Sequence, residues 1–268
     1  MERNLEDIQK NLILRVISAI IGASIFLLFL YIGGLLFKIL VILIAILGLL
    51  EYFKLVKNLG FRPFKLLTIL ASIILISFSQ SEDFLRITLI VFIALFIIFI
   101  LSIPFYYSSG RGIEDGAISI YGFLYLSIPS AIFVKLRSIG IEHTIYILGT
   151  TWTNDIFAFL IGKFFGRHKI AQNISPNKTI EGFIGGVLFS IIFAILFSYF
   201  FHFPTLKYVF FSIILSITGT IGDLTESVIK REAKVKDSGL FLPGHGGVLD
   251  RVDSLIVNIP VYFILSKL

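Results

Sequence analysis

One short stretch of the sequence holds an unusual share of the ionisable side chains. Residues 222–254 read GDLTESVIKREAKVKDSGLFLPGHGGVLDRVDS, and they contain 11 of the chain's 40 charged residues, 23 basic and 17 acidic. The rest of the chain is strongly apolar, and ionisable groups next to membrane-type sequence are energetically expensive. The cluster therefore marks a candidate functional site.

The carboxylates of this stretch have a spacing that suits a metal ion. Asp250 and Asp253 lie three residues apart at the start of a predicted helix, and an earlier helix carries a second acidic face. Short carboxylates from two helices offer oxygen ligands to a hard divalent cation, and Mg²⁺ fits best because it uses few protein carboxylates and completes its shell with water and phosphate. No histidine pair or thiolate favours Zn²⁺. The earlier face has the spacing i, i+3, i+4 and i+7 and consists of Asp223, Glu226, Ser227 and Lys230.

A glycine-rich loop lies between the two acidic groups. Residues 242–247 read LPGHGG, and glycines allow backbone N–H groups to approach an anion closely. Carboxylates for a metal, with amides and cations for oxyanions, are the groups that phosphoryl or nucleotidyl transfer requires. The alternative is a basic loop that binds anionic lipid, which accounts for the cations but not for the carboxylates or glycines. The surrounding cations are Lys230, Arg231, Lys234, Lys236 and Arg251.

A second polar loop precedes another predicted helix. Residues 175–182 read SPNKTIEG, with Thr179 and Glu181 at the start of the helix. The free N–H groups of a helix N-terminus attract phosphate, and Lys178 lies beside them. An ordinary helix start explains the same residues equally well.

The composition predicts an integral membrane protein. Hydrophobic residues make up 57% of the chain and charged residues only 15%, whereas a soluble domain has about 25% charged residues. The chain has no cysteine, which excludes disulfides and thiolate metal sites. The net charge of +6 is better explained by basic loops that fix membrane orientation than by nucleic-acid binding.

Apolar runs predict an all-α bundle of about nine transmembrane helices in a single membrane domain. A span needs about 20 apolar residues. The N-terminal helices are expected within residues 12–136 and the catalytic part within residues 144–268. The predicted spans are 12–30, 35–53, 64–80, 84–103, 117–136, 144–165, 180–201, 207–229 and 250–267.

Basic residues predict the orientation of this bundle. The N-terminus and alternate loops hold 17 Lys and Arg residues, and the other side holds six. Basic loops stay cytoplasmic, so we expect the N-terminus inside the cell and the C-terminus outside. The loops near residues 166–179 and 230–249 then lie together on the cytoplasmic face.

Polar residues inside the predicted spans carry further expectations. Glu51 is either an ordinary interfacial residue or a functional one, and neither alternative is favoured. Asp155 must be paired, protonated or exposed to a wet cavity, which favours a role at the site. Three glycines of the span 180–201 predict close helix packing rather than phosphate binding, namely Gly182, Gly185 and Gly186.

In the charged stretch at residues 222–254, the chain resembles the phosphatidate cytidylyltransferase family, also called the CDP-diacylglycerol synthases. The family signature has Ser, then Lys-Arg, then Lys-Asp, then Pro-x-His-Gly-Gly-x-x-Asp-Arg-x-Asp. Asp155, the loop at residues 175–182 and Gly222-Asp223 match further family features. The signature stands complete here as Ser227, Lys230-Arg231, Lys236-Asp237, Pro243, His245-Gly246-Gly247, Asp250-Arg251 and Asp253.

The resemblance implies a reaction, in which CTP and phosphatidic acid give CDP-diacylglycerol and pyrophosphate for phospholipid biosynthesis. It also implies a homodimer and a paired-metal centre of Mg²⁺ and K⁺, with Asp223 and Asp250 as the metal ligands and Asp253 close by. Lys230 joins the aspartates as a catalytic residue. Substrate and phosphate contacts are carried over to Ser175, Lys178, Thr179, Ser227, Arg231, Lys236, Asp237, His245, Gly246, Gly247 and Arg251.

Other functions remain possible at this point. An ether-lipid cytidylyltransferase or a polyprenol kinase would have a similar fold, although the complete signature argues against the kinase. A cation transporter could use Asp155 and Asp223 to line a path. Transporters are expected to spread charges over several spans, whereas here the charges gather at one face, which favours an enzyme.

Overall fold

The computed structural model describes residues 21–81, 84–239 and 246–267. The chain divides into two compact units. The first contains the residues up to Ser127 together with Ala233–Arg251, and the second contains Ile128–Glu232 and Val252–Leu268.

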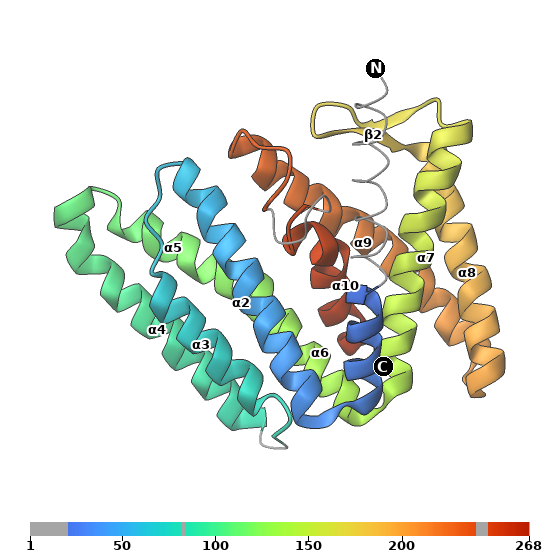
Figure 1. The fold of residues 1–268 in the computed structure, drawn as a ribbon, viewed down its shortest axis with the longest axis horizontal. Coiled ribbons are helices and arrows are strands. Elements are labelled where there is room, and N and C mark those ends of the chain that lie inside the picture. Colours follow the sequence, from blue (N-terminus) through green and yellow to red (C-terminus); the bar gives the residue numbers. More distant parts are fainter. Residues whose placement is uncertain (1–20, 82–83, 240–245, 268) are drawn as a thin grey trace, which may run out of the picture. The chain divides into compact units, whose positions relative to one another are not determined.

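The first unit is a group of packed helices (Figure 1). An apolar helix at Ile21–Ile32 precedes α2, and Gly33 separates the two. Gly33 and the first residue of α2, Gly34, both have positive φ. The helix α5 continues directly into a π-helical turn, η1, at the end of this segment. The labelled helices are α2 (Gly34–Asn58), α3 (Lys65–Phe78), α4 (Phe84–Ser109), α5 (Gly112–Gly122) and η1 (Phe123–Ser127).

The core of the first unit surrounds the C-terminal half of α2. Tyr52 and Phe53 are fully buried there, and the Tyr52 hydroxyl donates to the carbonyl of Ile118 in α5 at 3.0 Å. The buried carboxylate of Asp115 accepts the N–H of Arg62 at 2.7 Å, which fixes the connection that follows α2. The end of α2 that carries Glu51 is therefore fastened to α5 by buried side chains and hydrogen bonds.

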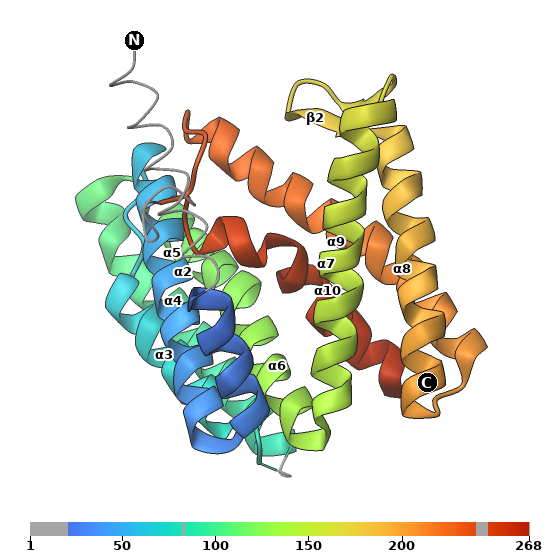
Figure 2. The same cartoon turned by 45° about the vertical axis from the view of Figure 1, so that its right-hand side comes forward.

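The second unit is built on the helix pair α7 and α8, which lie side by side in Figures 1 and 2. The glycines of α8 permit this contact, as the sequence predicted. A Cβ at Gly186 would come within 2.6 Å of Asn154 Oδ1, and one at Gly185 would collide with Ile161. The helices of this unit are α6 (Ile128–Ile139), α7 (Ile141–Phe165), α8 (Ile180–Phe201), α9 (Thr205–Glu232) and α10 (Leu249–Lys267), whose first three residues belong to the first unit.

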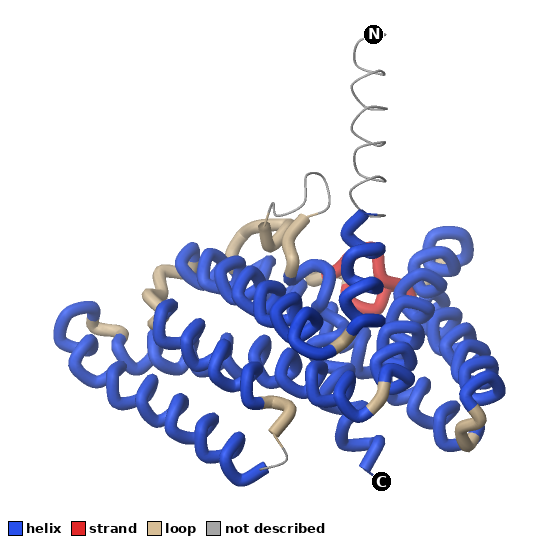
Figure 3. Tube along the Cα trace, turned by 60° about the horizontal axis from the view of Figure 1, so that its bottom comes forward, coloured by secondary structure: helices blue, strands red, loops and turns tan. Residues whose placement is uncertain are grey.

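A short antiparallel hairpin connects α7 to α8, where the sequence analysis expected a loop. It consists of β1 (Lys169–Ala171) and β2 (Ser175–Thr179), the strands coloured red in Figure 3. The N–H of Ile174 donates to the carbonyl of Ala171, which closes a turn over Gln172 and Asn173. Asparagine suits such turns, and the segment has no apolar run that could continue the helix.

The predicted all-α membrane class is confirmed, with the hairpin as the only strands in the described part of the chain. Each predicted apolar run corresponds to helix, although residues 12–20 of the first run lie outside the described residues. Within the described ranges, four helical segments are long and apolar enough to cross a membrane. These are Gly34–Asn58, Gly112–Ile139, Ile180–Phe201 and Thr205–Glu232. The count of about nine spans stays a prediction.

Candidate active site

The C-terminal half of α9 carries Asp223, and the β hairpin contacts it. Lys178 of β2 places its Nζ 2.7 Å from Asp223 Oδ2 and 3.4 Å from the carbonyl oxygen of Thr220. Arg231, two turns further along α9, donates from Nε to the carbonyl of Ile174 at 3.2 Å. The two polar segments that the sequence singled out in residues 175–182 and 222–232 therefore meet in the second unit.

Asp223 also has polar neighbours on its own helix and on others. The hydroxyl of Ser227, one turn later, donates to Asp223 Oδ1 at 3.4 Å. Asp253 of α10 and Asp155 of α7 both lie near enough to Asp223 for an interaction between carboxylates of like charge. Three helices thus bring carboxylates to one region of the second unit, with Lys178 as a neighbouring cation.

Lys230 forms an ion pair within α9. Its ammonium contacts the carboxylate of Glu226 one turn earlier, whose side chain is only 1% exposed. The sequence placed both residues on one helical face with Asp223, and the helix over these residues agrees with that prediction. The structure adds that Lys230 neutralises a buried carboxylate in addition to any contact with substrate.

The start of β2 and the start of α8 hold the remaining predicted residues of the second unit. Ser175 pairs with Ala171 in the hairpin. Thr179 precedes the first residue of α8, and its Oγ1 accepts the N–H of Gly182 at 3.2 Å. Thr179 therefore caps the helix, which leaves its proposed phosphate contact as a prediction.

The first unit holds Asp250 and the described end of the glycine loop. Oδ2 of Asp250 accepts the N–H of Gly247 at 2.8 Å and the N–H of Ser238 at 3.1 Å. Gly246 has φ of +81°, and a Cβ there would come within 2.7 Å of Asp250 Oδ2. The carboxylate is thus oriented by backbone donors, one of which comes from the glycine pair.

Other predicted residues are less informative. Arg251 at the start of α10 is exposed, as are Lys236 and Asp237 in the segment before the glycine loop. His245 lies outside the described residues. Asp250 belongs to the first unit and Asp223 to the second, and their joint binding of a metal stays a prediction.

Sequence reasoning missed two contributors to this arrangement. Ser238 follows the Lys236-Asp237 pair directly, but it is not among the residues predicted for the site. Glu51 was predicted to be either an interfacial or a functional residue, without any partner. In the structure its carboxylate lies beside Ser238 and the start of α10, at 2.9 Å from the backbone nitrogens of Val248 and Leu249. A carboxylate so close to the end of an apolar helix was the available signal.

The donor chemistry fits a hard cation but not a metal site made of protein alone. Within the described residues, no group of three or more His, Asp or Glu side chains is gathered to hold a metal ion. Oxygen ligands from one or two carboxylates, with phosphate and water completing the shell, are what Mg²⁺ commonly uses. The residues present are therefore compatible with Mg²⁺ bound together with a phosphorylated substrate.

Comparison with known proteins identifies the family. A sequence model of the cytidylyltransferase family matches residues 13–268. The chain belongs to the cytidylyltransferase family. The nucleotidyltransferase class predicted from the motif is thereby confirmed for this family member, and the transporter alternative falls away.

Relatives of this cytidylyltransferase-family chain occur in staphylococci. The phosphatidate cytidylyltransferase of Staphylococcus haemolyticus is 38% identical over 260 residues, which cover 94% of this chain and 97% of that protein. The protein of the same name from Staphylococcus epidermidis is 34% identical over 255 residues, with the same shares. The one from Staphylococcus aureus is 42% identical over 153 residues, and this match covers 56% of this chain and 59% of that relative.

Proposed function

We propose that this protein is a phosphatidate cytidylyltransferase of the cell membrane, which converts CTP and phosphatidic acid to CDP-diacylglycerol and pyrophosphate. The observation that carries the proposal is the near full-length similarity to relatives of that name, at 38% and 34% identity. The complete signature in residues 227–253 supports it, as does the contact between Lys178 and Asp223.

The reaction is a nucleotidyl transfer. A phosphate oxygen of phosphatidic acid attacks the α-phosphorus of CTP. The bond from that phosphorus to the oxygen shared with the β-phosphorus breaks, and pyrophosphate leaves. A phosphomonoester is largely dianionic near neutral pH, so the attacking oxygen needs no general base. The task left to the protein is to position the reactants and to balance their negative charge.

Charged residues of the signature and of the loop at residues 175–182 would share this task. Lys178, Arg231 and Lys236 would hold substrate phosphates, and Lys230 would do so while paired with Glu226. Asp223 and Asp250 would hold Mg²⁺, with Asp253 close by and K⁺ as a second ion. When bound, Mg²⁺ would neutralise charge on the nucleotide phosphates and the leaving pyrophosphate.

The membrane location suits the two substrates, since CTP is water-soluble and phosphatidic acid lies in the leaflet. We place the N-terminus and the active site on the cytoplasmic side and the C-terminus outside, because the basic residues are biased in that way. A homodimer is part of the proposal through the family resemblance. Light scattering of the detergent-solubilised protein, with the detergent mass subtracted, tests it.

The activity test uses CTP labelled at different phosphates. Purified protein in lipid–detergent micelles receives phosphatidic acid, Mg²⁺ and CTP labelled at either the α or the γ position. The proposal expects the α label in CDP-diacylglycerol and the γ label in pyrophosphate. A γ label in the lipid would reveal a kinase and overturn the proposal, and so would a wild-type protein without either product. Ether-linked phosphatidate assayed in parallel distinguishes acyl from ether substrates.

A further inference from the structure

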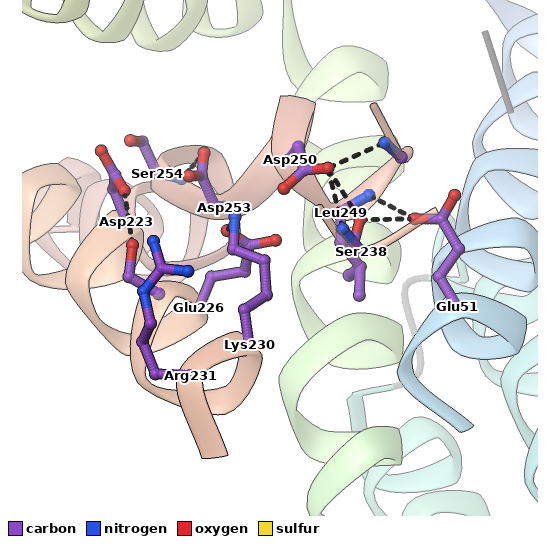
Figure 4. Close-up of polar contacts among 12 residues, drawn as sticks. Glu51, Asp223, Glu226, Lys230, Arg231, Ser238, Leu249, Asp250, Asp253 and Ser254 are labelled. Atoms are coloured by element: carbon purple, nitrogen blue, oxygen red, sulfur yellow. Dashed lines mark hydrogen bonds and ion pairs between the residues drawn. The ribbon is translucent and has the colours of Figure 1, made fainter. Parts of the chain in front are cut away.

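Glu51 of α2 binds the start of α10, although the two lie almost 200 residues apart in the sequence. Its Oε1 accepts the N–H of Val248 at 2.9 Å. Its Oε2 accepts the N–H of Leu249 at 2.9 Å (Figure 4). All of these residues belong to the first unit. The first N–H groups of a helix have no partner within the helix, so a carboxylate placed there satisfies them and interacts favourably with the helix dipole.

Ser238 connects this carboxylate to Asp250. The Ser238 hydroxyl lies 3.0 Å from Glu51 Oε2 and 3.0 Å from Asp250 Oδ2. A hydroxyl has a single hydrogen, so it can donate to only one of the two oxygens at a time. The backbone N–H of Ser238 also donates to Asp250, at 3.1 Å. Ser238 therefore ties the position of the Asp250 carboxylate to that of Glu51.

Two glycines make room for Glu51 at this point. A Cβ at Gly239 would come within 2.7 Å of Glu51 Cδ and would collide with its Oε1. A Cβ at Gly247 would also come within 2.7 Å of Glu51 Cδ and would collide with Ser238 Oγ. Gly247 belongs to the signature in which glycines were expected to serve an approaching phosphate. In the structure, its lack of a side chain leaves room for the carboxylate of Glu51.

We propose that Glu51 is a positioning residue of the active site. It holds the start of α10 through two backbone N–H groups and, through Ser238, it fixes the carboxylate of Asp250. The inference rests on the proposed function, in which Asp250 is a metal ligand. Groups that orient a metal ligand commonly change metal affinity by about 10- to 100-fold when they are removed.

The test compares the isosteric variant Glu51→Gln with wild type in the full-length protein. An amide offers one oxygen acceptor where the carboxylate offers two, so at least one bond to Val248 or Leu249 is lost. The first readout is hydrogen–deuterium exchange of peptides that contain residues 246–250, which should be faster in the variant. The second is the binding of Mn²⁺ together with CTP, followed by electron paramagnetic resonance, with an expected loss of affinity of about tenfold or more.

A second variant separates positioning from simple support of the helix. Ser238→Ala removes the hydroxyl that links Glu51 to Asp250. It leaves both backbone bonds of Glu51 and the backbone N–H bond from residue 238 to Asp250. It should weaken Mn²⁺ binding without faster exchange at Val248 and Leu249. In the double variant, the losses of Mn²⁺ affinity should be less than additive because both substitutions act on the same carboxylate. If Glu51 only supported the helix, Ser238→Ala would bind Mn²⁺ as tightly as wild type. The losses of Mn²⁺ affinity in the double variant would then be additive.

The control is Glu114→Gln, which alters an exposed carboxylate of α5 in the same unit. It should match wild type in exchange and in Mn²⁺ affinity. If Glu51→Gln and Ser238→Ala both bind Mn²⁺ within twofold of the Glu114→Gln control, Glu51 does not position Asp250 and the inference is overturned. A wild-type protein that makes no CDP-diacylglycerol would overturn the proposed function instead, whereas an active wild type with unaffected variants would overturn this inference alone.

Discussion

Asp223 contacts two other residues that were predicted for the site. Its two oxygens contact different partners, Lys178 at 2.7 Å and Ser227 at 3.4 Å. A carboxylate held on both sides is oriented before any ligand binds, and such preorganisation is a large part of catalysis by charge stabilisation. Both partners belong to motifs that the sequence had already selected.

Asp223→Asn should abolish most activity without unfolding the protein. The amide keeps the shape of the side chain but removes the charge that faces Lys178 and the proposed metal. We expect kcat/KM for CDP-diacylglycerol formation to fall by about 10²- to 10³-fold. Initial rates with varied CTP, together with size-exclusion elution of the variant, provide the measurement.

The matched control for this substitution is Glu232→Gln, which neutralises an exposed carboxylate at the end of the same helix. Its rate should stay within about twofold of wild type, because surface substitutions of this kind have small effects. Near-normal turnover in Asp223→Asn would show that the reaction does not depend on this carboxylate.

Lys230→Met should reduce stability as well as activity. It would leave the carboxylate of Glu226 buried without this cation, and breaking a buried pair typically costs about 3–5 kcal/mol. The thermal unfolding midpoint in detergent should therefore fall, together with kcat/KM. The double variant Glu226→Gln/Lys230→Met should regain part of the midpoint but not the activity. A single variant that loses activity with an unchanged midpoint would restrict Lys230 to substrate binding.

At the scale of elements, a buried amide joins three helices of the second unit. Asn258 of α10 is 1% exposed, and its Nδ2 donates to Thr151 of α7 at 2.9 Å. Its Oδ1 accepts the hydroxyl of Thr218 of α9 at 2.7 Å. The helices α7, α9 and α10 carry Asp155, Asp223 and Asp253, so this clamp helps to hold the three carboxylates in one region.

Asn258→Leu should loosen the clamp. The substitution leaves two hydroxyls without their amide partner, at a cost of about 1–2 kcal/mol within a membrane protein. We expect a lower thermal midpoint in detergent. Asn58→Leu, at the exposed end of α2, is the control and should leave the midpoint unchanged. A variant as stable as this control would mean that the Asn258 hydrogen bonds contribute nothing.

At the scale of the whole molecule, the absence of cysteine makes the orientation directly testable. Lys57→Cys and Lys207→Cys each give the chain a single thiol at an exposed position. The bias of basic residues places residue 57 in the cytoplasm and residue 207 outside. In intact cells, a membrane-impermeant maleimide should label only the variant at position 207.

Permeabilised cells provide the control for labelling, since both variants should then react. Equal labelling of both in intact cells, or labelling of position 57 alone, would contradict the orientation. The loops that carry the signature would then not face the cytosol, and the proposed reaction would have no access to cytosolic CTP.

The sequence was sufficient for the helices and for the helical face that carries Asp223. Long apolar runs dictate helices because an apolar solvent leaves the backbone no other partners, so α2, α8 and α9 lie close to their predicted ranges. The helical spacing of Asp223, Glu226 and Lys230 was equally readable, since it depends on local geometry alone. The hairpin at residues 169–179 was missed because a short polar segment gives little periodic signal.

Only the tertiary structure decided which distant residues touch. Glu51 and Ser238 are 187 positions apart, and nothing in the local sequence around either one specifies the other. Lys178 could have belonged to an ordinary helix start or bound phosphate, and its pairing with Asp223 required the hairpin to fold onto α9. Sequence alone determined which chemical groups this protein carries and which helices bear them, because both depend on residue type and local periodicity. The partners of those groups depend on packing between segments far apart in the chain.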